Sequence, residues 1–156
     1  CGLNPFSLCF MKDLKIKYYA YDIQCQELDL VKEYFKVVKE NFKEFDFEVK
    51  EINLFEEVPS IKTNCCFLFK FLDLLETKKQ YKLAEKIIKK INSRCIVVSF
   101  STKTLSGRKM NYPNRKWFEL MLKRLNFEFE ILKYENEIFY LFGKSQSSSS
   151  LSNLPA

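Results

Sequence analysis

The order of predicted strands and helices constrains the fold of this chain more than any other feature. Strand-like runs rich in β-branched and aromatic residues alternate with longer segments that carry apolar residues at helical spacing. Two final strand-like runs flank KYEN, which indicates a β-hairpin. This order predicts an α/β fold with a parallel sheet, crossover helices and an antiparallel hairpin. The predicted strands are 15–23, 47–55, 64–72 and 94–101, the helices are 27–45, 80–92 and 114–125, and the hairpin is 127–144.

The length and composition fit one domain followed by a tail. The chain has 156 residues, of which 47% are hydrophobic, enough to bury a core. Residues 145–156, SQSSSSLSNLPA, have a low-complexity composition that predicts a disordered tail. No run of about 18 uncharged apolar residues and no secretory signal is visible, so we expect no membrane span and a cytoplasmic location.

Six cysteines and the absence of histidine limit the available chemistry. No two cysteines have CxxC spacing, so we predict no metal site. Cys65, Cys66 and Cys95 lie in apolar runs and are expected to be small buried hydrophobic side chains, reduced as in intracellular proteins. Without histidine the commonest general base is missing, so any reaction must proceed without it.

The opening residues, CGLNPF, have the composition of a sharp turn between a strand and a helix. In α/β sheets of the doubly wound type, ligands bind at the carboxyl ends of strands, and an acidic residue about 20 positions after a glycine turn binds ribose hydroxyls. Asp22 lies twenty residues after Gly2, near the end of the predicted strand 15–23. Asp22 could therefore bind a nucleotide-like ligand, or it could merely cap the following helix. The spacing alone leaves both interpretations open.

Longer motifs resemble a known family. CGLNPF and YAYDI resemble the first two motifs of class I S-adenosylmethionine-dependent methyltransferases. CCFLFKFLDLLE and IVVSFSTKTLSGR, followed by a helix with WF, resemble the aminoglycoside-resistance 16S ribosomal RNA methyltransferases of the guanine-N7 type. The resemblance runs from Cys1 to about Lys144. It implies that 1–144 is a methyltransferase domain with a Rossmann-like class I sheet and a C-terminal antiparallel β-hairpin, truncated at its N-terminus and lacking the first strand of its relatives.

The resemblance also implies how S-adenosylmethionine would bind as cofactor. The glycine turn would contact its methionine part, Asp22 its ribose, and the end of the second predicted strand its adenine. The family's acidic residue in the third motif is Asn53 here, whose amide oxygen can still accept a hydrogen bond from the adenine amino group. The implied cofactor-binding residues are Gly2, Leu3, Asn4, Asp22, Ile23, Asn53, Leu54 and Phe69.

Lys70 matches the lysine of the family's fourth motif, which implies a catalytic role in positioning the guanine or the sulfonium end of the cofactor. The alternative is a lysine whose stem packs while its ammonium reaches water. Guanine N7 carries a lone pair and no proton, so its methylation needs alignment rather than a general base. This reaction suits a chain without histidine.

The charge distribution supports an RNA partner. Between Thr102 and Arg124, seven basic residues accompany one acid, Glu119, so this segment carries +6, the formal net charge of the whole chain. Basic side chains beside an active site would contact RNA phosphates, whereas Trp117 is expected to face the core. The residues expected to bind 16S ribosomal RNA in the 30S subunit are Lys103, Arg108, Lys109, Arg115 and Lys116.

Two other functions remain open at this point. Asn53 and a missing first strand also fit an RNA-binding accessory module that keeps the methyltransferase fold without turnover. A methyltransferase for another RNA or a small molecule is the second alternative, because GRKMNYPNRKW is shorter than in the family and Ser101 replaces its proline. Cofactor binding separates the accessory module from either enzyme.

Overall fold

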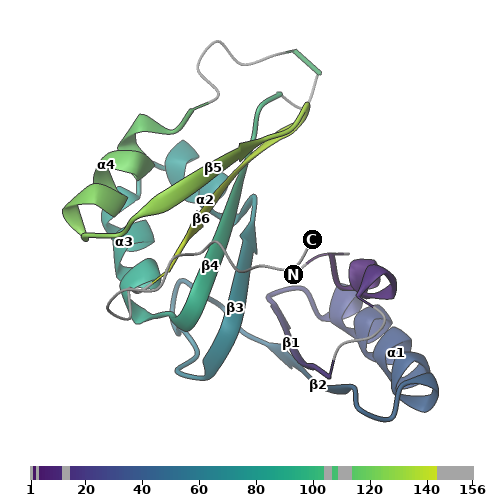
Figure 1. Cartoon of the computed structure of the whole chain (residues 1–156). Helices are drawn as coiled ribbons and strands as arrows, with labels where there is room; N and C mark the ends of the chain where they lie inside the picture. The colour runs from purple at the N-terminus through teal and green to yellow at the C-terminus, as the bar shows by residue number, and fades with distance from the viewer. Residues whose placement is uncertain (1, 3, 12–14, 104–106, 109–113, 144–156) are drawn as a thin grey trace. The chain divides into compact units, whose positions relative to one another are not determined.

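The computed structural model describes residues 2, 4–11, 15–103, 107–108 and 114–143 (Figure 1). The chain divides into two compact units, Cys1–Val58 and Pro59–Ala156. Each unit has its own hydrogen-bonded sheet. Two predicted site residues, Leu3 and Lys109, lie outside the described residues. No helix within the described ranges has the length and apolar character needed to cross a membrane.

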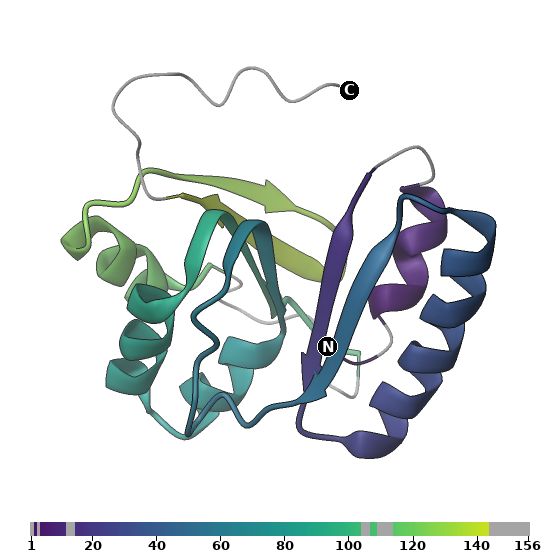
Figure 2. The ribbon, with the colours of Figure 1, turned by 90° about the horizontal axis from the view of Figure 1, so that it is seen from below.

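The first unit is a βαβ element, two parallel strands joined by a helix, preceded by a short 3-10 helix. Strands β1 (Lys17–Asp22) and β2 (Asp46–Glu51) pair in parallel, and helix α1 (Cys25–Asn41) connects them. The 3-10 helix η1 (Asn4–Phe10) comes before β1. Figure 2 shows α1 running alongside the strand pair.

Aromatic packing holds the first unit together. The ring of Phe35 on α1 is fully buried and contacts the rings of Tyr18 on β1 and Phe47 on β2. Ala20 at the centre of β1 and Val31 on α1 are also fully buried. The 3.6-residue period of α1 places its apolar side chains on the face that meets the strands.

The second unit contains a four-stranded sheet in the order β3-β4-β6-β5. Strands β3 and β4 are parallel, whereas β6 is antiparallel to both β4 and β5. In Figure 1 the helices of this unit lie on one side of its sheet. The elements are β3 (Lys62–Phe69), α2 (Phe71–Thr77), α3 (Tyr81–Lys90), β4 (Asn92–Ser101), α4 (Lys116–Arg124), β5 (Phe129–Lys133) and β6 (Glu137–Phe142).

One face of the four-stranded sheet forms the core of the second unit. Alternate residues of β4 and β6 point into this core, because successive side chains of a strand face opposite sides of the sheet. Phe118 of α4 packs edge-on against three of them, Phe100, Tyr140 and Phe142. The hydrophobic residues of β4 and β6 with 0–1% exposure are Ile96, Val98, Phe100, Ile138, Tyr140 and Phe142.

The predicted fold class is confirmed, including parallel strands, crossover helices and the C-terminal hairpin. The described strands form two separate sheets, one of β1 and β2 and one of β3, β4, β6 and β5, because no described strand pairs with members of both groups. The predicted strand 64–72 is too long, because Lys70 has a φ of 54° that no strand tolerates. Helix α2 therefore begins at Phe71, inside the apolar run that the sequence pattern had made look like strand.

Two smaller expectations were wrong. The predicted strand 47–55 ends earlier, since β2 stops at Glu51 and a turn follows. Cys65 is exposed and Cys66 is half-buried, because both lie on β3 at the edge of its sheet, and Cys95 on β4 is also half-buried. A continuous apolar run predicts a central strand that is buried on both faces, whereas a strand at the edge of a sheet buries less of its side chains.

Candidate functional site

In the first unit, the glycine turn and Asp22 are in direct contact. The N–H of Gly2 donates to Asp22 Oδ2 at 2.9 Å, while Oδ1 accepts from the N–H groups of Ile23 at 2.7 Å and Gln24 at 3.2 Å. Gly2 has a φ of 52°, a left-handed conformation that glycine adopts without strain. These contacts bring two predicted motifs together at the carboxyl end of β1.

The surroundings of Asp22 favour its ionised form. Burial alone would raise the pKa of this carboxyl group, but the hydrogen bonds donated to it, including those of Gly2 and Gln24, lower the pKa below its ordinary value. Asp22 also supports the start of α1, whose N-cap residue Gln24 makes no side-chain cap. The N–H groups of Ile23 and Gln24 that donate to Asp22 precede the first helical residue, Cys25, and the N-cap residue is Gln24, so Asp22 is not the N-cap of α1. Ligand binding by Asp22 stays a prediction.

Asn53 uses its side chain inside its own turn. Its Oδ1 accepts from the N–H of Phe55 at 3.1 Å, and its Nδ2 donates to Glu56 Oε1 at 2.6 Å. The N–H of the preceding Ile52 donates to the carbonyl of Asp22 at 2.8 Å, which joins the ends of β1 and β2. An adenine amino group would therefore have to share Asn53 Oδ1 with Phe55.

The remaining predicted cofactor residues of this unit surround the same strand ends. Ile23 follows Asp22 and is 55% exposed. Leu54 follows Asn53 and is half-buried, and Asn4 begins η1 with an exposed side chain. Their exposure leaves these side chains accessible to a ligand.

In the second unit, Lys70 occupies the carboxyl end of β3. Its N–H donates to Ser99 O at 3.0 Å and Ser99 Oγ at 3.2 Å, which fixes the left-handed backbone. Its Nζ forms an ion pair with Glu137 Oε1 of β6 at 2.6 Å. The neighbouring Phe69 packs edge-on against Phe139. A non-glycine residue held at positive φ costs free energy that the surrounding contacts must offset.

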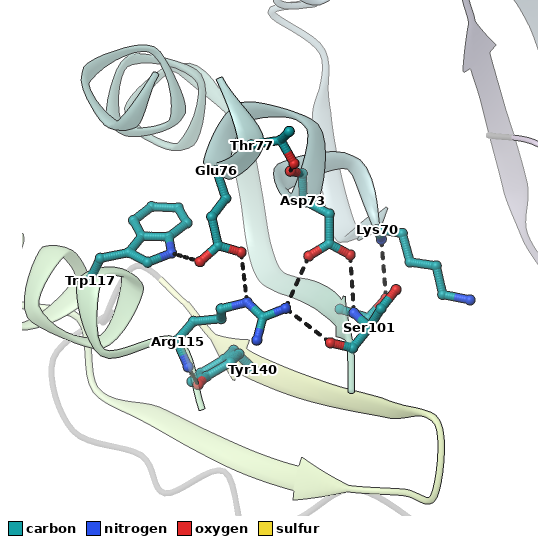
Figure 3. A network of polar contacts seen from close by, with 9 residues as sticks. Lys70, Asp73, Glu76, Thr77, Ser101, Arg115, Trp117 and Tyr140 are labelled. Atoms are coloured by element: carbon teal, nitrogen blue, oxygen red, sulfur yellow. Dashed lines mark hydrogen bonds and ion pairs between the residues drawn. The ribbon is translucent and has the colours of Figure 1, made fainter. Parts of the chain in front are cut away.

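The structure corrects the prediction for Arg115 (Figure 3). Its side chain is only 5% exposed and lies between two carboxylates of α2, with Nη2 3.3 Å from Asp73 Oδ1 and Nε 2.8 Å from Glu76 Oε2. Its Nη2 also donates to Ser101 O at 2.9 Å. A guanidinium enclosed in this way cannot meet RNA phosphates. It is buried because the two carboxylates offset the loss of hydration, which would otherwise cost several kcal/mol.

The same two carboxylates hold neighbouring groups. Asp73 Oδ2 accepts from the N–H of Ser101 at 3.0 Å, and Glu76 Oε1 accepts from Trp117 Nε1 at 2.8 Å. The indole of Trp117 packs edge-on against Phe100, so the expectation that Trp117 faces the core is confirmed. Both carboxylates of α2 thus bind two partners each.

Tyr140 extends this network into the sheet. Its hydroxyl oxygen accepts from the N–H of Arg115 at 2.9 Å and its O–H donates to Glu119 Oε1 at 2.9 Å. Burial and the bond to Glu119 raise the pKa of the phenol, so it stays protonated and keeps donating.

Three predicted RNA-binding residues keep solvent-accessible side chains. Lys103 forms an ion pair with Glu135 Oε1 at 2.7 Å in the turn between β5 and β6, and Lys116 is the exposed first residue of α4. Arg108 is exposed. Lys103 and Lys116 flank the carboxyl end of β4 and the start of α4, the edge where ligands of α/β sheets bind.

Asp73 and Glu76 were missed as site residues at the sequence level. The available signal was their spacing of three residues in the otherwise apolar FLDLLE, which places both side chains on one face if that segment is helical. Within the described ranges no group of three or more histidine, cysteine, aspartate or glutamate side chains could hold a metal. Burial raises the pKa of the Cys66 thiol to about 11, which makes it a poor nucleophile.

Comparisons with known proteins identify the family. The family described as "Ribosomal RNA methyltransferase (FmrO)" matches residues 1–141, and no curated protein matches the chain. The 16S rRNA methyltransferase RmtF, solved in complex with S-adenosyl-L-homocysteine, has a TM-score of 0.70 and 23% identity over 93% of this chain and 54% of its own. An rRNA methylase from Escherichia coli gives 0.66 and 20%, over 93% and 55%. The 16S rRNA methylase ArmA gives 0.64 and 23%, over 92% and 70%.

These solved structures establish a shared methyltransferase fold. The chain spans about half the length of RmtF and of the E. coli enzyme. The family match extends from the glycine turn to β6 and includes both units. The chain therefore belongs to the ribosomal RNA methyltransferase (FmrO) family.

Proposed function

We propose that this protein transfers a methyl group from S-adenosylmethionine to guanine N7 of 16S ribosomal RNA in the 30S subunit. The observation that carries the proposal is the hydrogen bond between Gly2 and the Asp22 carboxylate at the carboxyl end of β1. Nucleotide-like ligands bind at such an edge, with their ribose hydroxyls on an acidic residue. Membership of the family supports ribosomal RNA as the acceptor.

The residues of the first unit fit such a cofactor. An ionised carboxylate accepts about four hydrogen bonds, so ribose hydroxyls would share the oxygens of Asp22 with its backbone donors or displace them. Gly2 presents no side chain towards this position, and its φ of 52° is the conformation that favours glycine there. Asp22 would hold the ribose, Gly2 and Asn4 the methionine part, and Asn53 with Leu54 the adenine.

The chemistry asks little of the protein beyond alignment. Bound S-adenosylmethionine supplies a methyl group on a positively charged sulfonium. Because guanine N7 carries no proton, no side chain has to remove one, and the chain has no histidine. Its residues would hold the base in line and exclude water. The ammonium of Lys70, directed by Glu137, can donate to guanine O6 and leave the N7 lone pair available.

RNA binding is assigned to basic side chains at the edge of the second unit. Lys103, Arg108 and Lys116 would contact phosphates, and Lys109 is the further member proposed from sequence. Such contacts weaken as salt rises, because RNA binding releases counterions. An enzyme that modifies the small ribosomal subunit works where ribosomes are, so we infer a cytoplasmic location.

Two measurements test this function. Calorimetry with S-adenosylhomocysteine measures cofactor binding, and transfer of radiolabelled methyl groups to purified 30S subunits measures activity. Strand scission at N7-methylguanine then maps the modified nucleotide. Binding and labelling at one guanine N7 of 16S ribosomal RNA support the proposal, and labelling of another atom or another RNA contradicts the guanine-N7 assignment.

One observation favours a second candidate. Both polar atoms of the Asn53 amide are used within its turn, by Phe55 and Glu56. If these bonds persist, adenine loses a specific partner, and the protein would act as an RNA-binding accessory module without turnover. Absence of cofactor binding together with salt-dependent binding of 16S ribosomal RNA would identify that module.

A further inference from the structure

We propose that Arg115 is a positioning residue, which ties the carboxyl end of β4 and the start of α4 to α2 and thereby orients the basic side chains beside them. Arg115 would act on RNA through Lys103 and Lys116 and not by touching RNA. This inference rests on the proposed function, since it names what sets the geometry of the RNA-binding edge.

The first step is the burial of the charge. Among the described residues, Arg115 is the one charged residue that is buried, at 5% exposure. Its Nε lies 2.8 Å from Glu76 Oε2 without directing its N–H at that oxygen, so this contact is an ion pair rather than a hydrogen bond. Asp73 supplies the second carboxylate. Replacing a buried ion pair by apolar residues is often neutral for stability. A contribution to stability alone therefore does not account for a buried arginine at this position.

The second step is what the guanidinium connects. Asp73, Ser101 and Arg115 form a closed triangle, in which Asp73 accepts from Ser101 N–H and from Arg115 Nη2, and Nη2 donates to Ser101 O. Ser101 is the last residue of β4, and Arg115 is the N-cap residue of α4. One side chain of α2 therefore fixes both positions, as Figure 3 shows.

The third step is the place of the basic residues. Lys103 lies two positions after Ser101, and Lys116 lies one position after Arg115. The backbone of Arg115 is fixed from a further side, because its N–H donates to the hydroxyl of Tyr140. A shift at either anchored end would move the adjacent lysine, and misplacement of a substrate-positioning group by about 1 Å can cost about a hundredfold in rate.

The fourth step is why this residue is an arginine. Two nitrogens of its planar guanidinium serve three partners. Nη2 lies beside the Asp73 carboxylate and donates to Ser101 O, and Nε lies beside the Glu76 carboxylate. A lysine ammonium is a compact charge that cannot span the same partners. Arg115→Lys therefore keeps the buried charge but loosens the triangle, which makes it the informative substitution.

The test compares Arg115→Lys with Arg124→Lys. Arg124, at the other end of α4, forms an exposed ion pair with Glu85, so the same substitution there removes no anchor. We expect Arg115→Lys to raise the KM for 30S subunits by about tenfold, which corresponds to 1.4 kcal/mol. The dissociation constant for S-adenosylhomocysteine and the kcat should stay within about twofold of the parent, and Arg124→Lys should leave all three unchanged.

A readout independent of activity is the hydrogen exchange of the backbone amides of Ser101 and residue 115. We expect exchange of both to accelerate in Arg115→Lys, while Ile96 and Val98 in the centre of β4 keep the parent's rate. If Arg115→Lys does not fold, Asp73→Asn alone breaks the same link, and we expect it to raise the KM for 30S subunits and the exchange at Ser101 in the same way. If Arg115→Lys folds, adding Asp73→Asn to it should give little further rise in KM, because both changes break one link.

Two results would overturn the inference. One is an unchanged KM together with unchanged exchange at Ser101. The other is a uniform rise of exchange across β4 with equal loss of kcat and kcat/KM, which would make Arg115 structural support only. A parent protein that methylates no ribosomal RNA would refute the proposed function instead, and the positioning inference would then be decided by the local exchange and by the affinity for 16S ribosomal RNA.

Discussion

Gly2 and Asp22 share a hydrogen bond of 2.9 Å across twenty residues of sequence. The bond joins the backbone of the opening turn to the carboxylate at the end of β1, and so relates two motifs that the sequence only spaces apart.

Replacing Asp22 should weaken cofactor binding. Asp22→Ala removes charge-assisted hydrogen bonds to the ribose and is expected to cost about 2 kcal/mol of affinity. Calorimetry with S-adenosylhomocysteine measures this loss. Asp46→Ala is the matched control, because Asp46 is a carboxylate of the same strand pair at the first residue of β2, bound to Lys39. Equal affinity of the parent and Asp22→Ala would remove Asp22 from the cofactor site.

How far the sequence predicts the fold depends on the kind of signal. The alternation of strands and helices and the hairpin were predictable, since they follow from hydrophobic periods of 2 and 3.6 residues, which can be read from the local sequence without knowledge of tertiary contacts. Helix α2 was not, because FLDLLE continues the apolar run of β3 and a seven-residue helix shows less than two periods. The positive φ of Lys70 marks the boundary, and a lysine does not announce such a backbone in advance as a glycine or an asparagine can.

The site was predictable to a similar degree. The spacing of Gly2 and Asp22 and the edge where strands end predicted that both residues serve one ligand, but not the hydrogen bond between them. The burial of Arg115 did not, because a basic residue in a basic segment normally faces solvent. Its two carboxylate partners lie about forty residues earlier, just after the predicted strand 64–72 in a segment for which no helix was predicted, so the contact depends on tertiary structure.

Gly143 is expected to be intolerant of any side chain. A Cβ at this position would lie 2.4 Å from the carbonyl oxygen of Arg94, a backbone atom that cannot rotate away. Gly143→Ala should therefore lower the free energy of unfolding by about 1–3 kcal/mol, the usual cost of overpacking. Thermal or urea denaturation checks it. Gly107→Ala is the comparison: among the described residues no atom lies within 4 Å of a Cβ at this position, and its φ of 79° opposes the change, so the loss should be smaller. A stable Gly143→Ala would show that β4 and β6 separate easily at this end.

Lys70 permits a substitution that separates function from stability. Because its φ is 54°, Lys70→Gly relieves backbone strain and should leave the free energy of unfolding unchanged or raise it by about 1 kcal/mol. The same change removes the ammonium that pairs with Glu137, so methyl transfer to 30S subunits should fall at least about tenfold. Lys79→Gly is the control, since Lys79 also has a positive φ of 53° but follows α2. Full activity of Lys70→Gly would return Lys70 to the role of a solvated lysine.

Arg108 should contribute to RNA binding without affecting the cofactor. It is exposed after the carboxyl end of β4, in the segment with the densest unbalanced positive charge, and its planar fork can bind a phosphate or a guanine edge with two hydrogen bonds. Arg108→Gln should lower methylation of 30S subunits at moderate salt and reduce the slope of log affinity against log salt concentration by about 1, because one phosphate contact is lost. The dissociation constant for S-adenosylhomocysteine should not change. Lys123→Gln removes the same charge from the exposed far end of α4 and should do much less. Equal activity of Arg108→Gln and the parent at every salt concentration would show that Arg108 does not contact RNA.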